Sequence, residues 1–161
     1  MAKVVERAVN TLLPYIRHQD ILEIGCGAGE FSWAAIKYAN SVNCIDLDSF
    51  RLHPDLINNS QIHFQVMDAR RTSYKNEQFD TIVAYNAIGH LAENLKDILR
   101  ESLRIVKNTG CVIFISTFKM DRPVIQNDLQ DLCKEFELSS ELYQQDPFLI
   151  GFIKKLTRFF L

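Results

Sequence analysis

The chain has 161 residues, 47% of them apolar, which is enough for one sizeable core and close to the usual size of a single domain. Its formal charge of −2, with basic and acidic residues mixed throughout, argues against a nucleic-acid partner. No apolar run is long enough to cross a bilayer, and the first residues lack a signal-peptide core. We therefore expect a single domain over residues 1–161, located in the cytoplasm, with no membrane and no nucleic-acid partner.

Helix and strand patterns alternate from the N-terminus onward. Apolar residues at helical spacing predict a helix over residues 5–16, and the β-type run 21–24 predicts a strand that ends in a glycine-rich loop. A helix-forming stretch at 31–39 then precedes a second apolar strand at 42–47. This order is typical of a parallel sheet.

The middle of the chain continues the alternation after one ambiguous stretch. Pro54 should interrupt any helix between residues 49 and 60, because proline removes a helical hydrogen bond and clashes with the preceding turn. After this stretch come strands at 62–67, 81–84 and 111–117 and, before the last of them, a long amphipathic helix at 91–106 that Gly110 separates from the strand.

The C-terminal part departs from this alternation. A helix with Pro123 in its first turn is expected to reach residue 136. Residues 138–144 and 148–156 then predict two strands joined by a tight Asp146-Pro147 turn, hence a hairpin with one antiparallel strand. Together the patterns predict an α/β fold with a doubly wound, mostly parallel seven-stranded sheet and helices on both faces. Ligands of such sheets bind at the carboxyl ends of the strands where the winding reverses.

Three glycines, Gly25, Gly27 and Gly29, lie between the first predicted strand and the next helix. Glycine lets the backbone turn sharply and approach a ligand with no Cβ in the way. The third glycine comes one residue earlier than in the GxGxxG fingerprint of dinucleotide-binding proteins. The spacing therefore argues against NAD or FAD without excluding them.

Acidic residues follow the next two strands at the same predicted edge of the sheet. Asp46 ends the second strand, where a carboxylate can accept hydrogen bonds from vicinal ribose hydroxyls. Asp48 competes for this role, but we expect it to cap the following segment. Asp68 follows the third strand, where it could accept from an exocyclic amine while Met67 packs against a base. A turn or cap role for Asp68 is equally consistent with its position.

Five segments together carry a family resemblance. Residues 21–29 (ILEIGCGAG) combine a strand, an acid two residues before the first glycine, and the glycine loop, and the other four have the matching strands and turns: 42–46 (VNCID), 66–69 (VMDA), 79–84 (FDTIVA) and 103–110 (LRIVKNTG). In these segments the chain resembles the class I S-adenosylmethionine-dependent methyltransferases, a family with a Rossmann-like fold.

The resemblance implies S-adenosylmethionine as the cofactor. It places Glu23 and the backbone of the glycine loop at the methionine end, Asp46 at the ribose, and Asp68 with the Ala69 backbone at the adenine. Asn86, just past the fourth predicted strand, would line the site, although capping of the next helix is an equally good interpretation.

His90 is the candidate catalytic residue. S-adenosylmethionine is already activated, so the enzyme has mainly to align the acceptor and exclude water. Where the acceptor must lose a proton, His90 could act as the base, because it follows the fourth strand where a substrate could reach it. The alternative is a helix-start or cofactor-proximal residue that takes no part in acid–base catalysis. Tyr85 and Tyr15 could also face this pocket. The alternative for both is a role in the core or in the wall, which is common for aromatic residues beside apolar strands.

The sequence narrows the acceptor by exclusion. Residues 84–87 (AYNA) lack the Pro-Pro-aromatic signature of enzymes that methylate amino groups of nucleic-acid bases. The leading hypothesis is a methyltransferase for a small molecule or a protein side chain, with a bulky acceptor, a second copy of the chain or another subunit covering the site. The alternatives are a non-catalytic S-adenosylmethionine-binding partner subunit and, less favoured, a nicotinamide-dependent oxidoreductase.

Two further features have simple interpretations. The basic and aromatic segment Lys154–Leu161 is expected to be the last strand and a packed tail, with partner docking through Phe159–Leu161 as the alternative. Scattered cysteines without a CxxC pair argue against a zinc site or a disulfide framework and favour buried thiols. These cysteines are Cys26, Cys44, Cys111 and Cys133.

Overall fold

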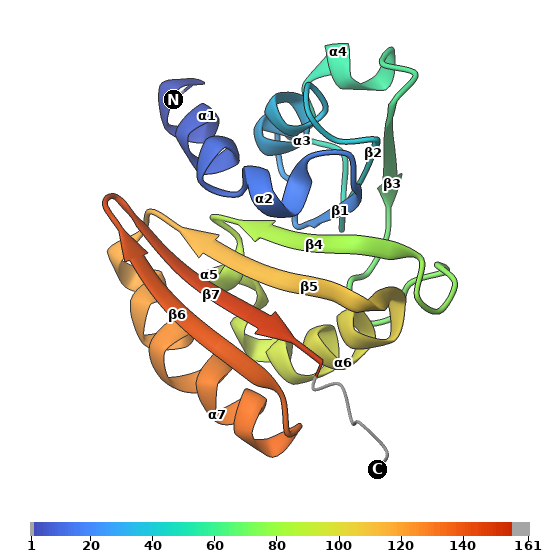
Figure 1. The fold of residues 1–161 in the computed structure, drawn as a ribbon. Helices are drawn as coiled ribbons and strands as arrows, with labels where there is room; N and C mark the ends of the chain where they lie inside the picture. The colour runs from blue at the N-terminus through green and yellow to red at the C-terminus, as the bar shows by residue number, and fades with distance from the viewer. Residues whose placement is uncertain (1, 156–161) are drawn as a thin grey trace.

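The computed structural model describes residues 2–155, and its centre is a seven-stranded sheet (Figure 1). The strand order is β3-β2-β1-β4-β5-β7-β6. Neighbouring strands from β3 through β5 are parallel, and β7 is antiparallel to both of its neighbours. The strands are β1 (Asp20–Ile24), β2 (Ser41–Asp46), β3 (Ile62–Val66), β4 (Phe79–Tyr85), β5 (Val106–Ser116), β6 (Ser139–Gln145) and β7 (Phe148–Lys154). The predicted fold, including its single antiparallel strand, is confirmed.

Helices cover both faces of the sheet (Figure 1). One face packs against α1 (Ala2–Thr11), α2 (Leu13–Ile16) and α3 (Glu30–Ala35), and the other against α5 (Ile88–Leu91), α6 (Leu95–Ile105) and α7 (Leu129–Glu135). Consecutive strand residues face opposite sides, so Ile21 belongs to the first apolar cluster and Leu22 to the second. The remaining short helices are α4 (Pro54–Ile57), η1 (Ala92–Asn94), η2 (Lys119–Asp121) and η3 (Val124–Asp128).

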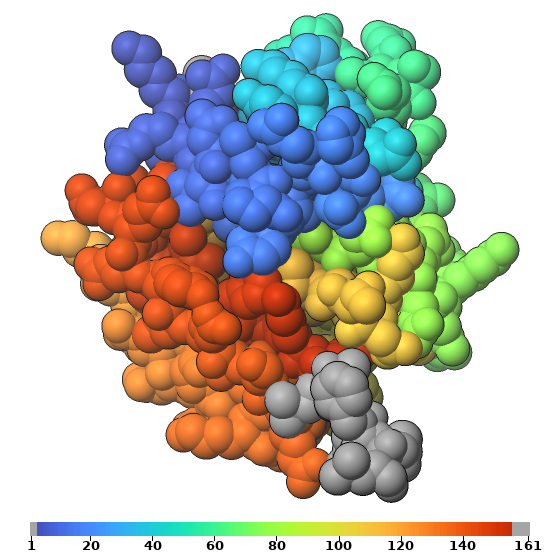
Figure 2. All heavy atoms as spheres, in the orientation of Figure 1, coloured from blue at the N-terminus to red at the C-terminus, as the bar shows by residue number. Residues whose placement is uncertain are grey.

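The N-terminal helix and the C-terminal hairpin lie side by side, although they are far apart in the sequence (Figure 2). Arg7 donates from Nη2 to the carbonyl oxygen of Asp146 at 2.9 Å. The rings of Tyr15 and Phe152 lie 4.5 Å apart between their centres. These contacts attach the hairpin to the first half of the chain.

Pro54 is the first residue of α4 and no helix runs through it, as predicted, because proline fits the first helical turn, where the N–H groups need no acceptor. Other predicted boundaries were wrong. The helix predicted over residues 5–16 is divided into α1 and α2. The long helix predicted at 91–106 is divided into α5, η1 and α6. Strand β5 starts at Val106, so Gly110 lies inside the strand and does not precede it. Glycine is needed at this position because a Cβ there would clash with the carbonyl oxygen of Asp80.

Other predictions concern burial and the chain ends. All four cysteines are buried and free, as expected for buried thiols. Within the described part of the chain, no helix has both the length and the apolar character that a membrane crossing requires. The segment Phe159–Leu161, expected to be a packed tail with partner docking as the alternative, lies outside the described residues.

The winding of the sheet reverses between β1 and β4. From β1 the chain continues to β2 and β3 on one side, and it then returns to add β4 and β5 on the other side. At the carboxyl ends of β1 and β4, the two following loops therefore run in opposite directions, which leaves a crevice between them.

Candidate functional site

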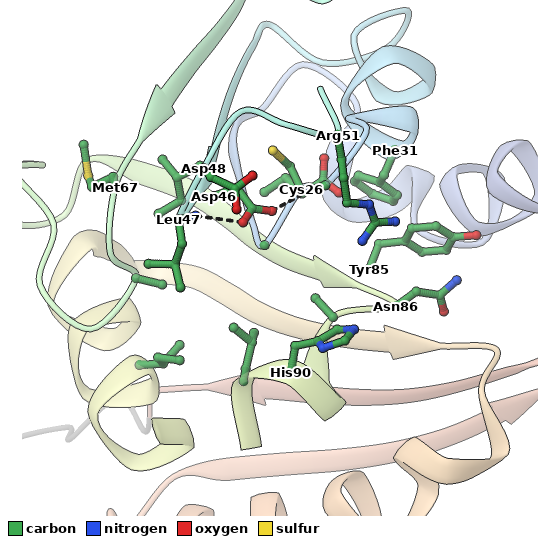
Figure 3. A pocket seen from close by; sticks show the side chains of 18 of the residues that line it. Cys26, Phe31, Asp46, Leu47, Asp48, Arg51, Met67, Tyr85, Asn86 and His90 are labelled. Carbon is green, nitrogen blue, oxygen red and sulfur yellow. Dashed lines mark hydrogen bonds between the residues drawn. The ribbon is translucent and has the colours of Figure 1, made fainter. Parts of the chain in front are cut away.

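A cavity of about 610 Å³ lies at this reversal point (Figure 3). All of the predicted site residues except Gly29 line it. Those that do are Glu23, Gly25, Gly27, Asp46, Met67, Asp68, Ala69, Asn86 and His90. The volume lies within the usual range for small-molecule and cofactor sites.

The glycine loop has a backbone that favours glycine at all three positions. The φ angles are +66° at Gly25, +53° at Gly27 and +77° at Gly29, in the left-handed region. A Cβ built on Gly29 would lie 2.5 Å from Cδ1 of the buried Leu56, so this glycine permits close packing of α4 and does not line the cavity. Gly25 and Gly27 instead line the cavity.

Asp46 connects the end of β2 to the glycine loop. Its Oδ2 accepts a hydrogen bond from the Gly27 N–H at 2.7 Å, and its Oδ1 accepts one from the Leu47 N–H at 2.7 Å. Each carboxylate oxygen keeps a further lone pair, because it accepts only one of these bonds. Asp48 also lines the cavity, but its Oδ1 accepts from the Phe50 N–H at 2.9 Å, as expected for a residue that caps the next segment.

Glu23 is a buried acid beneath the loop, with 1% of its surface exposed. Its Oε2 accepts hydrogen bonds from the N–H and the hydroxyl of Ser32, at 3.0 and 2.5 Å. Burial raises the pKa of Glu23 to about 8, and the bonds from Ser32 only partly oppose this effect. A carboxyl group at this position can therefore exchange a proton near neutral pH.

We expect Glu23→Gln to change the pH dependence of stability. The folded protein keeps the Glu23 proton between the ordinary pKa of 4.5 and about 8, while the unfolded chain has released it. The free energy of unfolding of the wild type should therefore fall relative to the variant as pH rises through this window, by an amount of the order of a few kcal/mol. Urea unfolding at pH 5 to 9 tests this, and parallel curves for the two proteins would contradict it.

Asp68 has the turn geometry that its position allowed. Its Oδ1 accepts from the Arg70 N–H at 2.9 Å, and its Oδ2 pairs with Arg70 Nη2 at 2.6 Å. Hydrogen bonds from Arg70 hold the pKa of this carboxyl below its usual range. Asp68 still lines the cavity together with Met67 and Ala69. Arg70 Nε also donates to both carboxylate oxygens, at 3.0 and 2.9 Å, so an adenine amine would have to compete with Arg70 for Asp68.

Asn86 joins the ends of β4 and β5. Its φ is +52°, and its Oδ1 accepts from the N–H and the hydroxyl of Thr117 at 2.8 and 3.2 Å. Helix capping by Asn86 was the wrong alternative, because Ala87 occupies the N-cap of α5 and no side chain caps that helix. Asn86 thus holds the loop after β4 in place at the cavity wall.

Of the histidine and tyrosine candidates, His90 and Tyr85 line the cavity and Tyr15 does not. His90 lies in α5, exposed at the cavity (Figure 3). Tyr85 forms part of the wall and stacks on Phe31 with 5.6 Å between ring centres, and burial raises its pKa. Tyr15 instead packs on Phe152 in the core and does not line the cavity.

Two prominent residues of the cavity wall were not predicted from the sequence. Arg51 lies in the ambiguous stretch after β2, and Phe118 follows β5. Neither belongs to a motif or to a periodic pattern. The only available signal was their position just beyond the carboxyl end of a strand, which is where ligands of doubly wound sheets bind.

Comparison with known proteins agrees with this architecture. A family model described as a methyltransferase domain matches residues 22–114, which is more than half of the chain. No curated protein matches the sequence. Many solved structures are similar to this chain. The three described below share less than 25% of their sequence with it, so their likeness shows a common fold and nothing more.

Three of these structures illustrate the likeness. A proposed S-adenosyl-L-methionine-dependent methyltransferase of Methanococcus maripaludis has a TM-score of 0.83 and 17% identity, over 99% of this chain and 89% of that one. A TehB-like SAM-dependent methyltransferase from Corynebacterium glutamicum has a TM-score of 0.73 and 23% identity, over 94% and 86%. The N-methyltransferase NodS from Bradyrhizobium japonicum has a TM-score of 0.72 and 18% identity, over 95% of both chains.

Proposed function

This chain belongs to the methyltransferase domain family, and from that premise we propose that it is a single-domain enzyme that transfers a methyl group from S-adenosylmethionine to a small molecule or a protein side chain. One observation carries the cofactor assignment. The acid at the end of β2 accepts a hydrogen bond from the glycine loop after β1, so that Asp46 and Gly27 form one continuous wall of the cavity.

The residues of the cavity suit the parts of this cofactor. Asp46 has lone pairs available for the ribose hydroxyls, and Asp68 with the Ala69 backbone takes the adenine amine, beside the apolar Met67. Glu23 and the glycine loop border the methionine end. S-adenosylmethionine supplies an activated methyl group, so the protein has to orient the acceptor and keep water away from the reacting atoms.

Calorimetric titration with S-adenosylmethionine, S-adenosylhomocysteine and NAD tests the cofactor assignment. Binding of the first two compounds with no response to NAD is the expected result. A preference for NAD would favour the nicotinamide-dependent alternative and overturn the proposal. Binding without methyl transfer to any acceptor of either class would favour the non-catalytic partner subunit.

His90 is proposed as the base for acceptors that lose a proton. His90→Gln should leave the affinity for S-adenosylhomocysteine nearly unchanged, while the turnover number falls about a hundredfold, within the range that a positioned base contributes. An unchanged turnover number in the variant would contradict the base role of His90.

The open side of the cavity supports cover by a bulky acceptor, by a second copy of the chain or by another subunit. Leu47 lines the cavity and has 70% of its surface exposed, and Phe50 in the same loop has 95% exposed. Analytical ultracentrifugation with and without S-adenosylhomocysteine would reveal a dimer.

A cytoplasmic location fits the four free cysteines, because reducing compartments keep thiols unpaired, and cell fractionation would test it.

A further inference from the structure

Arg51 is a cation in the cavity wall that no acidic side chain compensates. Three basic residues line the cavity, namely Arg51, Arg70 and His90. The guanidinium of Arg70 is paired with Asp68. In contrast, none of the carboxylates within residues 2–155 lies at ion-pair distance from Arg51, and no side-chain hydrogen bond involves it. The charge of Arg51 is therefore available to a ligand.

The guanidinium lies flat against the glycine loop. A Cβ built on Gly27 would lie 3.5 Å from Cζ of Arg51, 3.6 Å from Nη1 and 3.7 Å from Nη2, so the planar group covers the face where Gly27 has no side chain. The segment that carries it is attached to the loop, because the His53 N–H donates to the Ala28 carbonyl oxygen at 3.2 Å. Figure 3 shows the guanidinium directed across the cavity towards Tyr85.

The charges of the cavity divide between its two ends. Arg70 and Asp68 neutralise each other at the proposed adenine end. Around the loop, the wall also carries four carboxyl groups, on Glu23, Glu30, Asp46 and Asp48. Such acids suit the sulfonium and the ammonium of S-adenosylmethionine. The cofactor's only anionic group is the carboxylate of its amino-acid arm, and this carboxylate requires a cation at the same end.

We propose that Arg51 binds the carboxylate of the methionine arm and so makes the site selective for a cofactor with an intact amino-acid end. The inference rests on the proposed function, since it assumes that S-adenosylmethionine occupies the cavity. Two parallel N–H···O bonds from a guanidinium to a carboxylate give both affinity and orientation. Fixing the arm would also fix the sulfonium, and with it the direction in which the methyl group points.

The test compares two ligands that differ only in the carboxylate: S-adenosylmethionine and its decarboxylated form. The wild type should bind the complete cofactor about ten- to a hundredfold more tightly. Arg51→Ala should remove this preference by weakening the complete cofactor alone. Arg51→Lys should retain part of it, because lysine keeps the charge but loses the planar fork. Arg17→Ala is the matched control, since Arg17 is exposed on the loop before β1 and has no side-chain partner among the described residues.

The other outcomes are distinct. An unchanged preference in Arg51→Ala would overturn the inference and leave an anionic acceptor as the partner of Arg51. An equal loss of affinity for both ligands would mean that Arg51 only maintains the conformation of the glycine loop, and this result would also overturn the inference. If the wild type binds neither ligand, the proposed cofactor itself is wrong. Thermal melting of each variant verifies folding, which we expect to be intact because the Arg51 side chain is exposed and makes no hydrogen bond to any residue of the range 2–155.

Discussion

Replacing Asp46 with alanine should weaken the binding of S-adenosylhomocysteine by at least about a hundredfold. The variant loses the carboxylate that accepts from the ribose hydroxyls, and hydrogen bonds to a charged group contribute about 1.5–3 kcal/mol each. It also removes the acceptor of the Gly27 N–H, so that the glycine loop loses its attachment to β2. Calorimetric titration measures the dissociation constant directly.

Two comparisons separate the ribose role from loop attachment. Asp46→Asn keeps one carbonyl oxygen that can still accept from Gly27 N–H, so its loss of affinity should be intermediate. Asp48→Ala removes a neighbouring acid whose Oδ1 accepts from Phe50 N–H, and its affinity should fall by less than about threefold. Equal losses at Asp46 and Asp48 would reject the assignment of the ribose to Asp46.

Gly29→Ala should lower the free energy of unfolding by about 2–4 kcal/mol. A left-handed backbone costs a non-glycine residue about 1–2 kcal/mol, and the added Cβ would lie 2.5 Å from Leu56 Cδ1. Leu56 is 2% exposed, so it has little room to move aside. Equilibrium unfolding in urea gives the difference from the wild type.

Gly27→Ala is the matched control for this steric effect. Gly27 also has a positive φ, +53°, but its nearest neighbours would be the side-chain atoms of Arg51 at ordinary contact distance. Only the backbone cost of about 1 kcal/mol is expected there. Leu56→Ala combined with Gly29→Ala should cost less than the sum of the two single changes, because the shortened side chain leaves space for the new Cβ. Equal destabilisation at Gly27 and Gly29 would contradict the steric argument.

The sequence by itself determined the fold and the approximate place of the site. Alternating apolar patterns are local, since the period of a strand or a helix is set within a few residues. The order of strands and helices then specified a doubly wound sheet, and the hairpin at Asp146-Pro147 specified its antiparallel strand. Because ligands bind at the carboxyl ends of such strands, Gly25, Asp46 and Asp68 could be assigned to one cavity before any contact was known.

Only the tertiary structure decided which partner each side chain has. Ser32 donates a buried hydrogen bond to Glu23, whose pKa is raised by burial, and Thr117 donates one to Asn86. No local sequence pattern relates the segments that these bonds join. The same holds for Arg51, whose position against Gly27 depends on how the segment after β2 packs on the loop. Local spacing determines where a strand ends, but contacts between distant segments arise only when the helices and strands pack together, and these contacts set the charges of the site.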